Sequence, residues 1–460
     1  MRGKRLRHDP TAAPTGWTRR AIAGGLAGLL AASRAVAATT LPPRGIEPGR
    51  FLWGTAISGH QSEGNNVNSD AWYLESHQPT AFAEPSGDAC DSYHRSEQDL
   101  DIAASLGLNC YRFGIEWSRI EPEPGRFSMA ELDRYARVLE ACHARGLTPM
   151  VTYNHFTVPM WFAERGGFEV ADGAELFARY CDRTTRRLGS LIGFASTFNE
   201  ANIVLLRKVL PRFATEAAAA NARAMMAAAA RNTASPGFSS ILFGDPDKIS
   251  AVMLDAHAKG YAAIKAAAPA LPVGVTLSMQ QIDGVGPDNK AEEAEATIYG
   301  GWIDAARASD FIGVQTYSRL RIGAKGLLPS PPGAELTAAG YEYYPSAVGA
   351  TIRYAAQHIG KPIYLTETGI ATDDDARRIA FIDATIAEVR RCIAEGIDVK
   401  SYIYWSLLDN FEWTAGYGKH FGLVGVDRTN FTRTPKPSAR RLGAYARANL
   451  NKGENHVQAG

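Results

Sequence analysis

Two glutamates, Glu200 and Glu367, each stand at the end of a short apolar segment of the chain. The first follows Thr197-Phe198-Asn199, and the second lies between Thr366 and Thr368-Gly369. Two carboxyl groups that face one another across a cavity are what cleavage of a glycosidic bond requires, since one protonates the leaving oxygen and the other meets the anomeric carbon. A single glutamate at such a position is more commonly salt-bridged or solvated, so the assignment depends on its surroundings.

Three further polar side chains lie in or next to other apolar segments and could converge on the same cavity: Arg112, His155 and Tyr317. A cation and a phenol beside Glu367 would keep this carboxylate ionised, as a nucleophile requires. Repulsion from ionised Glu367 would raise the pKa of Glu200 and keep it protonated for the first step. After Glu367 is glycosylated, that charge is lost, the pKa falls, and Glu200 can act as a base toward water. The pattern predicts a retaining reaction with Glu200 as acid/base and Glu367 as nucleophile.

Aromatic and acidic residues near the C-terminus suit recognition of a sugar. Tyr404-Trp405-Ser406 is followed by Asp409-Asn410-Phe411-Glu412-Trp413. Aromatic faces pack on the apolar face of a pyranose, and a carboxylate accepts hydrogen bonds from adjacent hydroxyls. Gln61 offers an amide that donates and accepts at once. The alternative interpretation is that the tryptophans belong to the core and Glu412 is a surface charge.

Eight short segments rich in β-branched and aromatic residues alternate with amphipathic helical patterns, as in strands buried on both faces. The predicted strands are Phe51–Ile57, Cys110–Ile115, Thr148–Tyr153, Phe194–Phe198, Pro272–Ser278, Asp310–Tyr317, Pro362–Thr366 and Ser401–Ser406. Predicted helices include Glu131–Ala144 and Asp375–Glu395, and the alanine-rich stretch Ala214–Ala230 favours a helix in the loop after the fourth strand. This alternation of strand and helix patterns predicts a single-domain α/β protein, a (β/α)₈ TIM barrel with elaborated βα loops. A doubly wound open sheet is the alternative, but no glycine-rich turn follows the first strand.

The first 37 residues have the pattern of an export signal. Basic residues lead into Arg19-Arg20, a short apolar run from Ala21 to Ala32, and the cleavage motif Ala35-Val36-Ala37. The paired arginines favour twin-arginine export of a folded protein to the periplasm or the medium, and a disordered basic tail is the alternative. We therefore predict a signal peptide at 1–37, a short leader at 38–50, the glycosidase barrel at 51–450 and a C-terminal tail at 451–460.

The charge balance indicates no polyanionic partner. The whole chain has a net charge of +1, and without the leader 42 basic and 47 acidic residues remain, a net charge of −5. The sequence has no Lys/Arg cluster of the kind that binds nucleic acid. No segment after the leader is apolar for the roughly 20 residues that a membrane span needs. The five scattered cysteines indicate neither a disulfide framework nor a zinc site and suit small buried hydrophobic positions.

The order of these motifs resembles that of glycoside hydrolase family 1, the retaining β-glucosidases and β-galactosidases. The resemblance covers essentially the whole chain after the leader. It rests on Phe51–Ala56, Gln61-x-Glu63-Gly64, Asp88-Ala89-Cys90-Asp91-x-Tyr93-His94-Arg95, Tyr111–Ile120, Thr197–Glu200, Thr366-Glu367, Trp405–Trp413 and Phe421–Val424.

The resemblance implies a role for each matching residue. Glu200 corresponds to the acid/base and Glu367 to the nucleophile, with Arg112 and Tyr317 positioning the nucleophile. The residues that hold the non-reducing sugar would be Gln61, His155, Asn199, Glu412 and Trp413, with Trp405 as the floor. The resemblance implies neither a cofactor nor a metal. The substrate would be a small glycoside or oligosaccharide, and the acidic Glu412 favours an unphosphorylated sugar because a carboxylate repels phosphate.

Four short segments depart from the family pattern. His155-Phe156-Thr157 stands where the family has His-Trp-Asp, and Gln315-Thr316-Tyr317 where it has Asn-Tyr-Tyr. Glu367-Thr368-Gly369 replaces Glu-Asn-Gly, and Ala201-Asn202-Ile203 lacks the usual Pro-Trp continuation. None of these departures removes a carboxylate of the pair. Together they alter the leaving-group side, so the aglycone stays open, as does the choice among glucose, galactose, fucose and xylose.

Two other functions fit parts of the same pattern. A transglycosylase shares the covalent intermediate and differs in whether a sugar hydroxyl or water attacks it. A non-catalytic sugar-binding barrel is a different class of protein, because a fold alone does not establish a function. Such barrels tend to lose one carboxylate, whereas this chain keeps both. The prediction is therefore a retaining β-glycosidase.

Overall fold

The computed structural model describes residues 50–210 and 216–453. These residues fall in one structural unit, Gly45–Gly460. The predicted signal peptide and most of the short segment after it lie outside the described residues, so export stays a prediction. Across residues 50–210 and 216–453, no helix combines the length and hydropathy needed for a membrane span.

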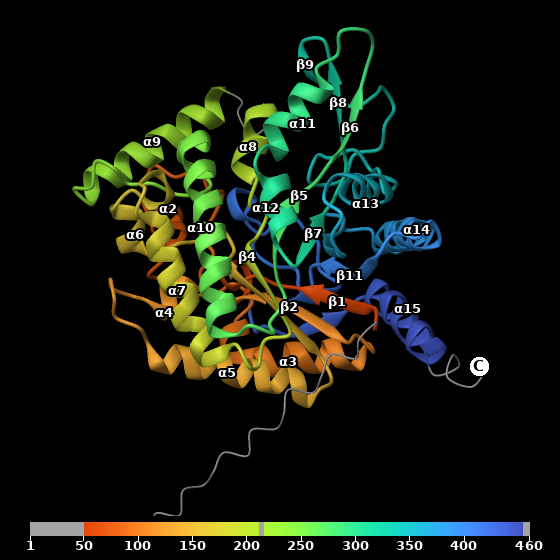
Figure 1. The fold of residues 1–460 in the computed structure, drawn as a ribbon, viewed down its shortest axis with the longest axis horizontal. Coiled ribbons are helices and arrows are strands. Elements are labelled where there is room, and N and C mark those ends of the chain that lie inside the picture. Colours follow the sequence, from red (N-terminus) through yellow and green to blue (C-terminus); the bar gives the residue numbers. More distant parts are fainter. Residues whose placement is uncertain (1–49, 211–215, 454–460) are drawn as a thin grey trace, which may run out of the picture. The chain divides into compact units, whose positions relative to one another are not determined.

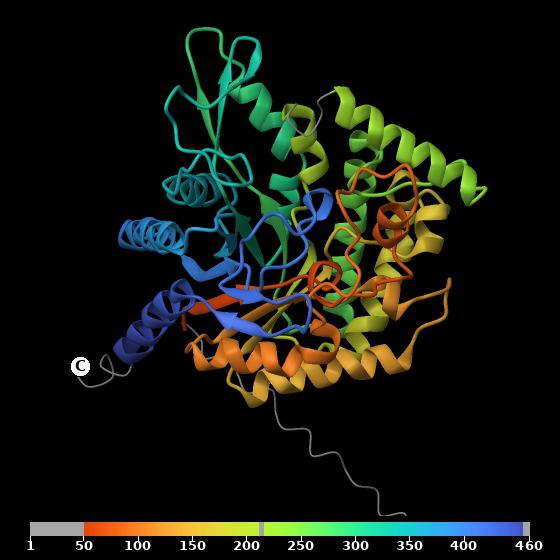
Figure 2. The same ribbon diagram turned by 180° about the vertical axis from the view of Figure 1, so that it is seen from behind.

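Eight parallel strands close into a barrel in the order β1-β11-β10-β7-β5-β4-β3-β2. Figures 1 and 2 show the barrel from opposite sides, with the first strand beside the last where the sheet closes. The strands are β1 Leu52–Ala56, β2 Cys110–Gly114, β3 Thr148–Asn154, β4 Phe194–Phe198, β5 Val273–Ser278, β7 Phe311–Gln315, β10 Ile363–Thr368 and β11 Val399–Trp405. Each overlaps one predicted strand, so the predicted (β/α)₈ barrel is confirmed.

Helices surround the strands and fill the loops between them (Figure 1). The helices that alternate with the strands include α3 Ser92–Ser105, α5 Met129–Ala144, α7 Gly173–Leu188, α10 Pro246–Ala267, α12 Trp302–Ala308, α13 Ala347–His358, α14 Asp375–Ala394 and α15 Pro437–Gly453. Further helices are α1 Gly59–Ser62, α2 Asp70–Ser76, α4 Trp117–Ile120, α6 Met160–Glu164, η1 Gly167–Glu169, α8 Ile203–Val209, α11 Ala291–Tyr299 and η3 Trp413–Ala415. The alanine-rich stretch forms α9, Glu216–Asn232, between β4 and β5. The predicted helices at 131–144 and 375–395 correspond to α5 and α14.

The remaining strands belong to βα loops. A three-stranded sheet of β6 Gln281–Gly284, β8 Arg319–Gly323 and β9 Gly326–Leu328 stands beyond the barrel (Figure 1). A two-stranded sheet of β12 Val424–Val426 and β13 Arg433–Pro435 follows β11. These insertions confirm the predicted elaboration of the loops.

The side chains form two cores because successive residues of a strand point to opposite faces. The smaller core lies inside the barrel and takes residues from seven of its strands: Leu52, Ala56, Cys110, Met150, Phe194, Phe311, Tyr364, Ile403 and Trp405. In β5, Gly274 leaves room for Phe311, since a Cβ atom there would lie 2.5 Å from the Phe311 ring. The larger core, between strands and helices, includes the neighbouring residues Tyr111 and Phe113. Arg112 therefore points into the barrel together with Cys110.

All five cysteines lie in the described ranges, and all are buried and unpaired. Burial raises the pKa of the Cys110 thiol to about 12, which keeps it protonated. The cysteines thus pack as small apolar side chains, as predicted.

His257 is a buried histidine that connects α10 to β4, the strand just before Asn199-Glu200. Its Nδ1 lies 2.7 Å from Thr197 Oγ1, and its Nε2 lies 3.1 Å from Ser309 Oγ. Burial lowers the pKa of His257 to about 4. The unfolded chain therefore binds a proton at higher pH than the folded chain, so this histidine's contribution to stability is lost as pH falls from about 6.5 to 4.

We expect His257→Asn to weaken this dependence of stability on pH. As the pH falls over that range, the free energy of unfolding of the variant should decrease by about 3 kcal/mol less than that of the wild type. Urea denaturation at pH 7 and pH 4 measures the difference. The exposed residue His77, replaced in the same way, serves as the control. An unchanged difference between wild type and His257→Asn at the two pH values would contradict the assignment.

Candidate functional site

Glu367 is held from two sides at the end of β10. The Arg112 guanidinium bonds its Oε1, and the Tyr317 hydroxyl donates to its Oε2 over 2.7 Å. Glu367 is 4% exposed, and Arg112 is fully buried. Each carboxylate oxygen thus has its own fixed donor, which orients the group and supports its negative charge.

A shift in strand pairing aims Glu367 at these partners. Tyr364 packs inside the barrel and Leu365 outside, so strict alternation would turn Glu367 outward. The pairing register of β10 shifts after Leu365 against both neighbouring strands, β7 and β11. Irregularities of this kind re-aim side chains next to functional sites. The shift brings the Glu367 carboxyl group to Arg112.

Glu200 follows β4 in a backbone conformation that residues other than glycine rarely adopt. Its φ is +40°. The Glu200 N–H donates to Thr276 Oγ1 and to Gln315 Oε1, both over 3.1 Å. Such strained backbone persists where surrounding contacts fix it, and it clusters at functional sites. The side chain is partly buried.

Asn199 and Gln315 join the two glutamates into one network. Asn199 Oδ1 accepts from Arg112 over 2.6 Å and from the Gln315 amide over 2.8 Å. Arg112 bonds Glu367, and Gln315 bonds the backbone of Glu200. Because Oδ1 of Asn199 is occupied, its amide N–H groups are left to donate to a ligand.

The carboxyl groups influence one another electrostatically. Burial, and then the charge of Glu367, raise the pKa of Glu200 to about 8. Burial also raises the pKa of Glu367, but Arg112 and Tyr317 act in the opposite direction. The expected asymmetry is therefore present: the group between a cation and a phenol is helped to ionise, and its neighbour is helped to stay protonated.

Four stacked rings line the side of the site formed by β1, β3 and β11. His155 lies 5.6 Å from Trp405 at an interplanar angle of 22°, and 6.3 Å from Trp413 at 14°. His60 stacks on Trp413, with ring centroids 5.5 Å apart. Burial, and then the charge of Arg112, lower the pKa of His155 well below its usual value, so its ring is neutral. Within the described part of the chain this ring makes no hydrogen bond, so its N–H is available to a ligand.

Glu412 and Gln61 complete this side. The Trp405 indole N–H donates to Glu412 Oε1 over 3.2 Å. Burial raises the pKa of Glu412 well above its usual value, and the acidic neighbours Glu367, Asp409 and Glu200 add to the effect. The Gln61 amide donates to the Phe411 carbonyl over 2.8 Å and accepts from Ser58 over 2.7 Å, leaving one N–H and one lone pair free.

The structure brings all ten predicted site residues together at the C-terminal ends of the strands, where barrel enzymes place their chemistry. The alternative interpretation placed both tryptophans in the core and Glu412 on the surface. Trp405 is buried and packs in the inner core. Trp413 is half-buried, and Glu412 is half-buried and bonded to Trp405.

No site role was predictable from the sequence for Gln315, Thr276 or Glu116. Gln315 and Thr276 bond the Glu200 backbone directly. Gln315 is the last residue of β7, but the predicted strand ran on to Tyr317, so in the sequence Gln315 was only a departure from the family pattern. Among the described residues, no group of three His, Cys, Asp or Glu side chains could hold a metal ion.

Comparison with known proteins identifies the family to which this chain belongs. The model of the family described as glycosyl hydrolase family 1 matches residues 45–309 and 323–450. The apo structure of a β-glucosidase designated 1317 is 47% identical, with a TM-score of 0.84, over 86% of this chain and 98% of that chain. The crystal structure of the β-glycosidase BGL167 is also 47% identical, with a TM-score of 0.82, over 86% and 96% of the two chains.

A characterised relative extends the comparison. Beta-glucosidase A of Thermotoga maritima is 29% identical over 85% of this chain and 95% of its own length. The family match spans nearly the whole described chain, and the barrel carries the two glutamates at its strand ends. The chain belongs to glycosyl hydrolase family 1 and is a β-glycoside hydrolase.

Proposed function

We propose that the protein is a retaining β-glycosidase that removes terminal, non-reducing β-D-glucosyl residues, or galactosyl or fucosyl residues, from small glycosides and oligosaccharides. The observation that carries this proposal is the shared network of Arg112, Asn199 and Gln315. It connects a glutamate after β4 to a glutamate in β10, and Glu367 helps to raise the pKa of Glu200. Two carboxyl groups with opposite protonation states are what double displacement needs.

In the first step, Glu367 attacks the anomeric carbon while Glu200 donates its proton to the departing oxygen. The glycosidic C–O bond breaks, the aglycone leaves as a neutral alcohol, and an ester forms between the sugar and Glu367. Arg112 and Tyr317 hold the attacking carboxylate in its ionised form and fix both oxygens. These two bonds hold the carboxylate in the orientation for attack.

In the second step, water attacks the same carbon. The ester has no charge, so the repulsion that raised the pKa of Glu200 is gone, and Glu200 can accept a proton from the water. The C–O bond to Glu367 breaks, Glu367 regains its negative charge, and the sugar leaves. Two inversions at one carbon preserve the β configuration.

The sugar itself would lie on Trp405, next to Glu412. Asn199, His155 and Gln61 each have a free hydrogen-bonding atom for its hydroxyls. A third carboxyl group beside the reacting pair makes the site unfavourable for a phosphorylated sugar. The glucosyl preference is supported by two of the similar proteins, which are named β-glucosidases.

A panel of 4-nitrophenyl glycosides tests the proposal. We expect turnover of the β-D-glucoside and of at least one of the β-D-galactoside and β-D-fucoside, with the β-D-xyloside included for comparison. The 4-nitrophenyl α-D-glucoside serves as the control and should stay intact, since its leaving group would point away from Glu200. Hydrolysis of the α-glucoside alone, or of no glycoside in the panel, would overturn the proposal.

A further inference from the structure

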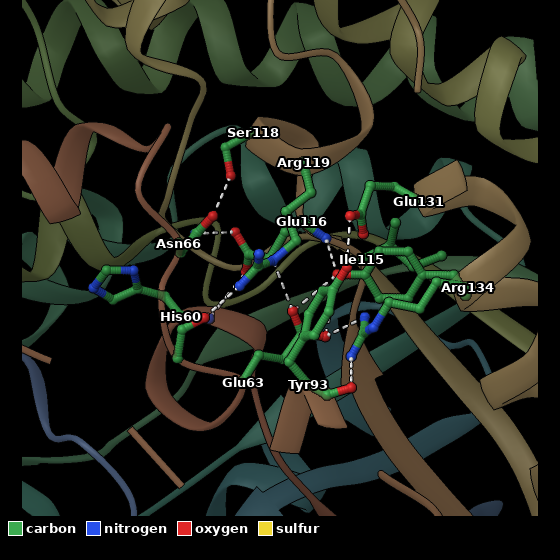
Figure 3. A network of polar contacts seen from close by, with 12 residues as sticks. His60, Glu63, Asn66, Tyr93, Ile115, Glu116, Ser118, Arg119, Glu131 and Arg134 are labelled. Atoms are coloured by element: carbon green, nitrogen blue, oxygen red, sulfur yellow. Dashed lines mark hydrogen bonds and ion pairs between the residues drawn. The ribbon is translucent and has the colours of Figure 1, made fainter. Parts of the chain in front are cut away.

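Glu116 is a buried carboxyl group that has no part in the reaction described above. It lies just beyond the end of β2 and is 3% exposed. Its Oε1 accepts the backbone N–H of His60 over 3.2 Å. Its Oε2 accepts from the Asn66 amide over 2.9 Å and from the Thr157 hydroxyl over 2.7 Å. One carboxyl group therefore fastens three separate segments of chain (Figure 3 shows the contacts to His60 and Asn66).

Two of these segments carry residues assigned to the sugar. His60 precedes Gln61 in α1, and Thr157 follows His155 by two residues. Between His155 and Thr157 the backbone of Phe156 has a φ of +73°. Asn154 secures this turn from within, accepting from the Phe156 N–H over 3.1 Å and donating to the Thr157 carbonyl over 2.8 Å. The bond from Thr157 to Glu116 connects this turn to α1.

The packing of Glu116 against α1 leaves no spare room. A Cβ atom on Gly59 would lie 2.4 Å from Cγ and 2.5 Å from Oε1 of Glu116. The absence of a side chain at Gly59 is therefore what lets the carboxyl group reach the His60 N–H. No ion pair to Glu116 forms within the described residues, and burial raises its pKa. Burying a carboxyl group without a neighbouring cation costs free energy. Packing alone therefore does not explain why a glutamate occupies position 116.

The segments that contain His60 and His155 also pack on an aromatic ring of the site. Trp413 lies between His60 and His155, with centroid distances of 5.5 Å and 6.3 Å. If His60 moved relative to His155, Trp413 would have to follow. The spacing of Gln61, His155 and Trp413 therefore depends on the bonds that Glu116 makes.

The backbone of Glu116 is anchored independently of its carboxyl group. Its N–H donates to the Tyr135 hydroxyl over 3.1 Å, and Tyr135 bonds Glu63. Glu63 in turn lies between Arg119 and Arg134, each 3.0 Å away (Figure 3). A change confined to the carboxyl group should leave this anchored framework in place.

We propose that Glu116 is a positioning residue for sugar recognition, which holds the segments of Gln61 and His155 at the spacing that the non-reducing sugar requires. This inference rests on the proposed function. Glu116 touches neither glutamate of the reacting pair, so its effect should fall on binding of the sugar rather than on the chemical steps.

The first test is Glu116→Gln. The amide keeps the size of the side chain, but its NH₂ group must face one of the three donors. On the best substrate of the panel we expect KM to rise about tenfold or more while kcat stays within about threefold, because the lost contacts act alike in the ground and transition states. The change should be the same with 2,4-dinitrophenol and 4-nitrophenol as leaving groups.

Glu121→Gln is the matched control. Glu121 is also fully buried, and it bonds Trp117, Gly125 and Arg179 rather than the segments of the sugar site. This variant should lose thermal stability and keep its KM. If Glu116→Gln keeps a KM within about twofold of the wild type, or if both variants change KM alike, the inference is wrong. An inactive wild type would instead overturn the proposed function, which is a distinct outcome.

Two further variants keep the test decisive if Glu116→Gln folds poorly. Gly59→Ala retains the carboxyl group and displaces it, so KM should rise in the same direction. Thr157→Val removes one of the three bonds, so KM should rise less. Added to Glu116→Gln, it should have a smaller effect than it has alone, since the two residues share a contact and their effects should not add. Unchanged KM values in both single variants would also overturn the inference.

Discussion

Replacing Glu367 with glycine should lower kcat/KM on 4-nitrophenyl β-glycosides by on the order of 10⁴-fold or more, because no other group can form the ester to the anomeric carbon. Arg112 and Tyr317 would remain, but they would face an empty position. Steady-state kinetics with the purified variant measures the loss. Circular dichroism should show that the barrel is intact, since the strand pairs of β10 do not need the side chain.

Azide provides a matched test of the same position. In Glu367→Gly a small anion can enter from the face that the carboxylate occupied, so azide should restore turnover and give the α-glycosyl azide. Tyr317→Phe is the milder control, since it removes one donor to Glu367 and keeps the nucleophile. Turnover near the wild-type level in Glu367→Gly without added anion would rule out its role as nucleophile.

Replacing Glu200 with alanine should have a different signature, because it removes the acid and leaves the nucleophile. Turnover of substrates with poor leaving groups should fall by roughly 10²- to 10⁴-fold, the usual contribution of general acid catalysis. With 2,4-dinitrophenyl glycosides the first step needs no proton, so the ester should accumulate. Azide should then attack it and give the β-glycosyl azide, opposite in configuration to the product of Glu367→Gly.

The pH profile checks the same assignment. Glu200 must be protonated in the first step, so kcat/KM should fall as pH rises through the pKa of about 8 that burial and Glu367 impose. In Glu200→Ala this alkaline limb should disappear. An alkaline limb that persists unchanged in the variant would assign the proton donor to another group.

The barrel and its two glutamates were predictable because both depend on local signals. Each strand is a short, continuous apolar run, and the strand ends of a barrel converge whatever the loops do. For this reason Glu200 and Glu367 could be paired across 167 positions of sequence without knowledge of the intervening fold. Arg112 could also be placed, because it lies in the second predicted strand, Cys110–Ile115.

Other features depend on contacts between distant residues and have no local signal. The positive φ of Glu200 is fixed by Gln315, which lies 115 residues away. The register shift in β10 turns Glu367 inward against strict alternation. The burial of Glu367 could not be predicted from the sequence either. Burial raises the pKa of Glu367, while Arg112 and Tyr317 act to lower it. Glu116 lies within Tyr111–Ile120, a segment that resembles the family, but its three bonds, which indicate a positioning role, appear only in the fold.

The central claim is that Glu200 and Glu367 act on one anomeric carbon and that Glu367 becomes bonded to it. A 2,4-dinitrophenyl 2-deoxy-2-fluoro-β-D-glucoside tests this directly, since fluorine slows both steps and the reactive leaving group preserves the first. We expect one equivalent of dinitrophenol, loss of activity, and a fluorosugar on the peptide that contains Thr366-Glu367-Thr368. A label on any other residue, or loss of activity without a covalent label, would contradict the account.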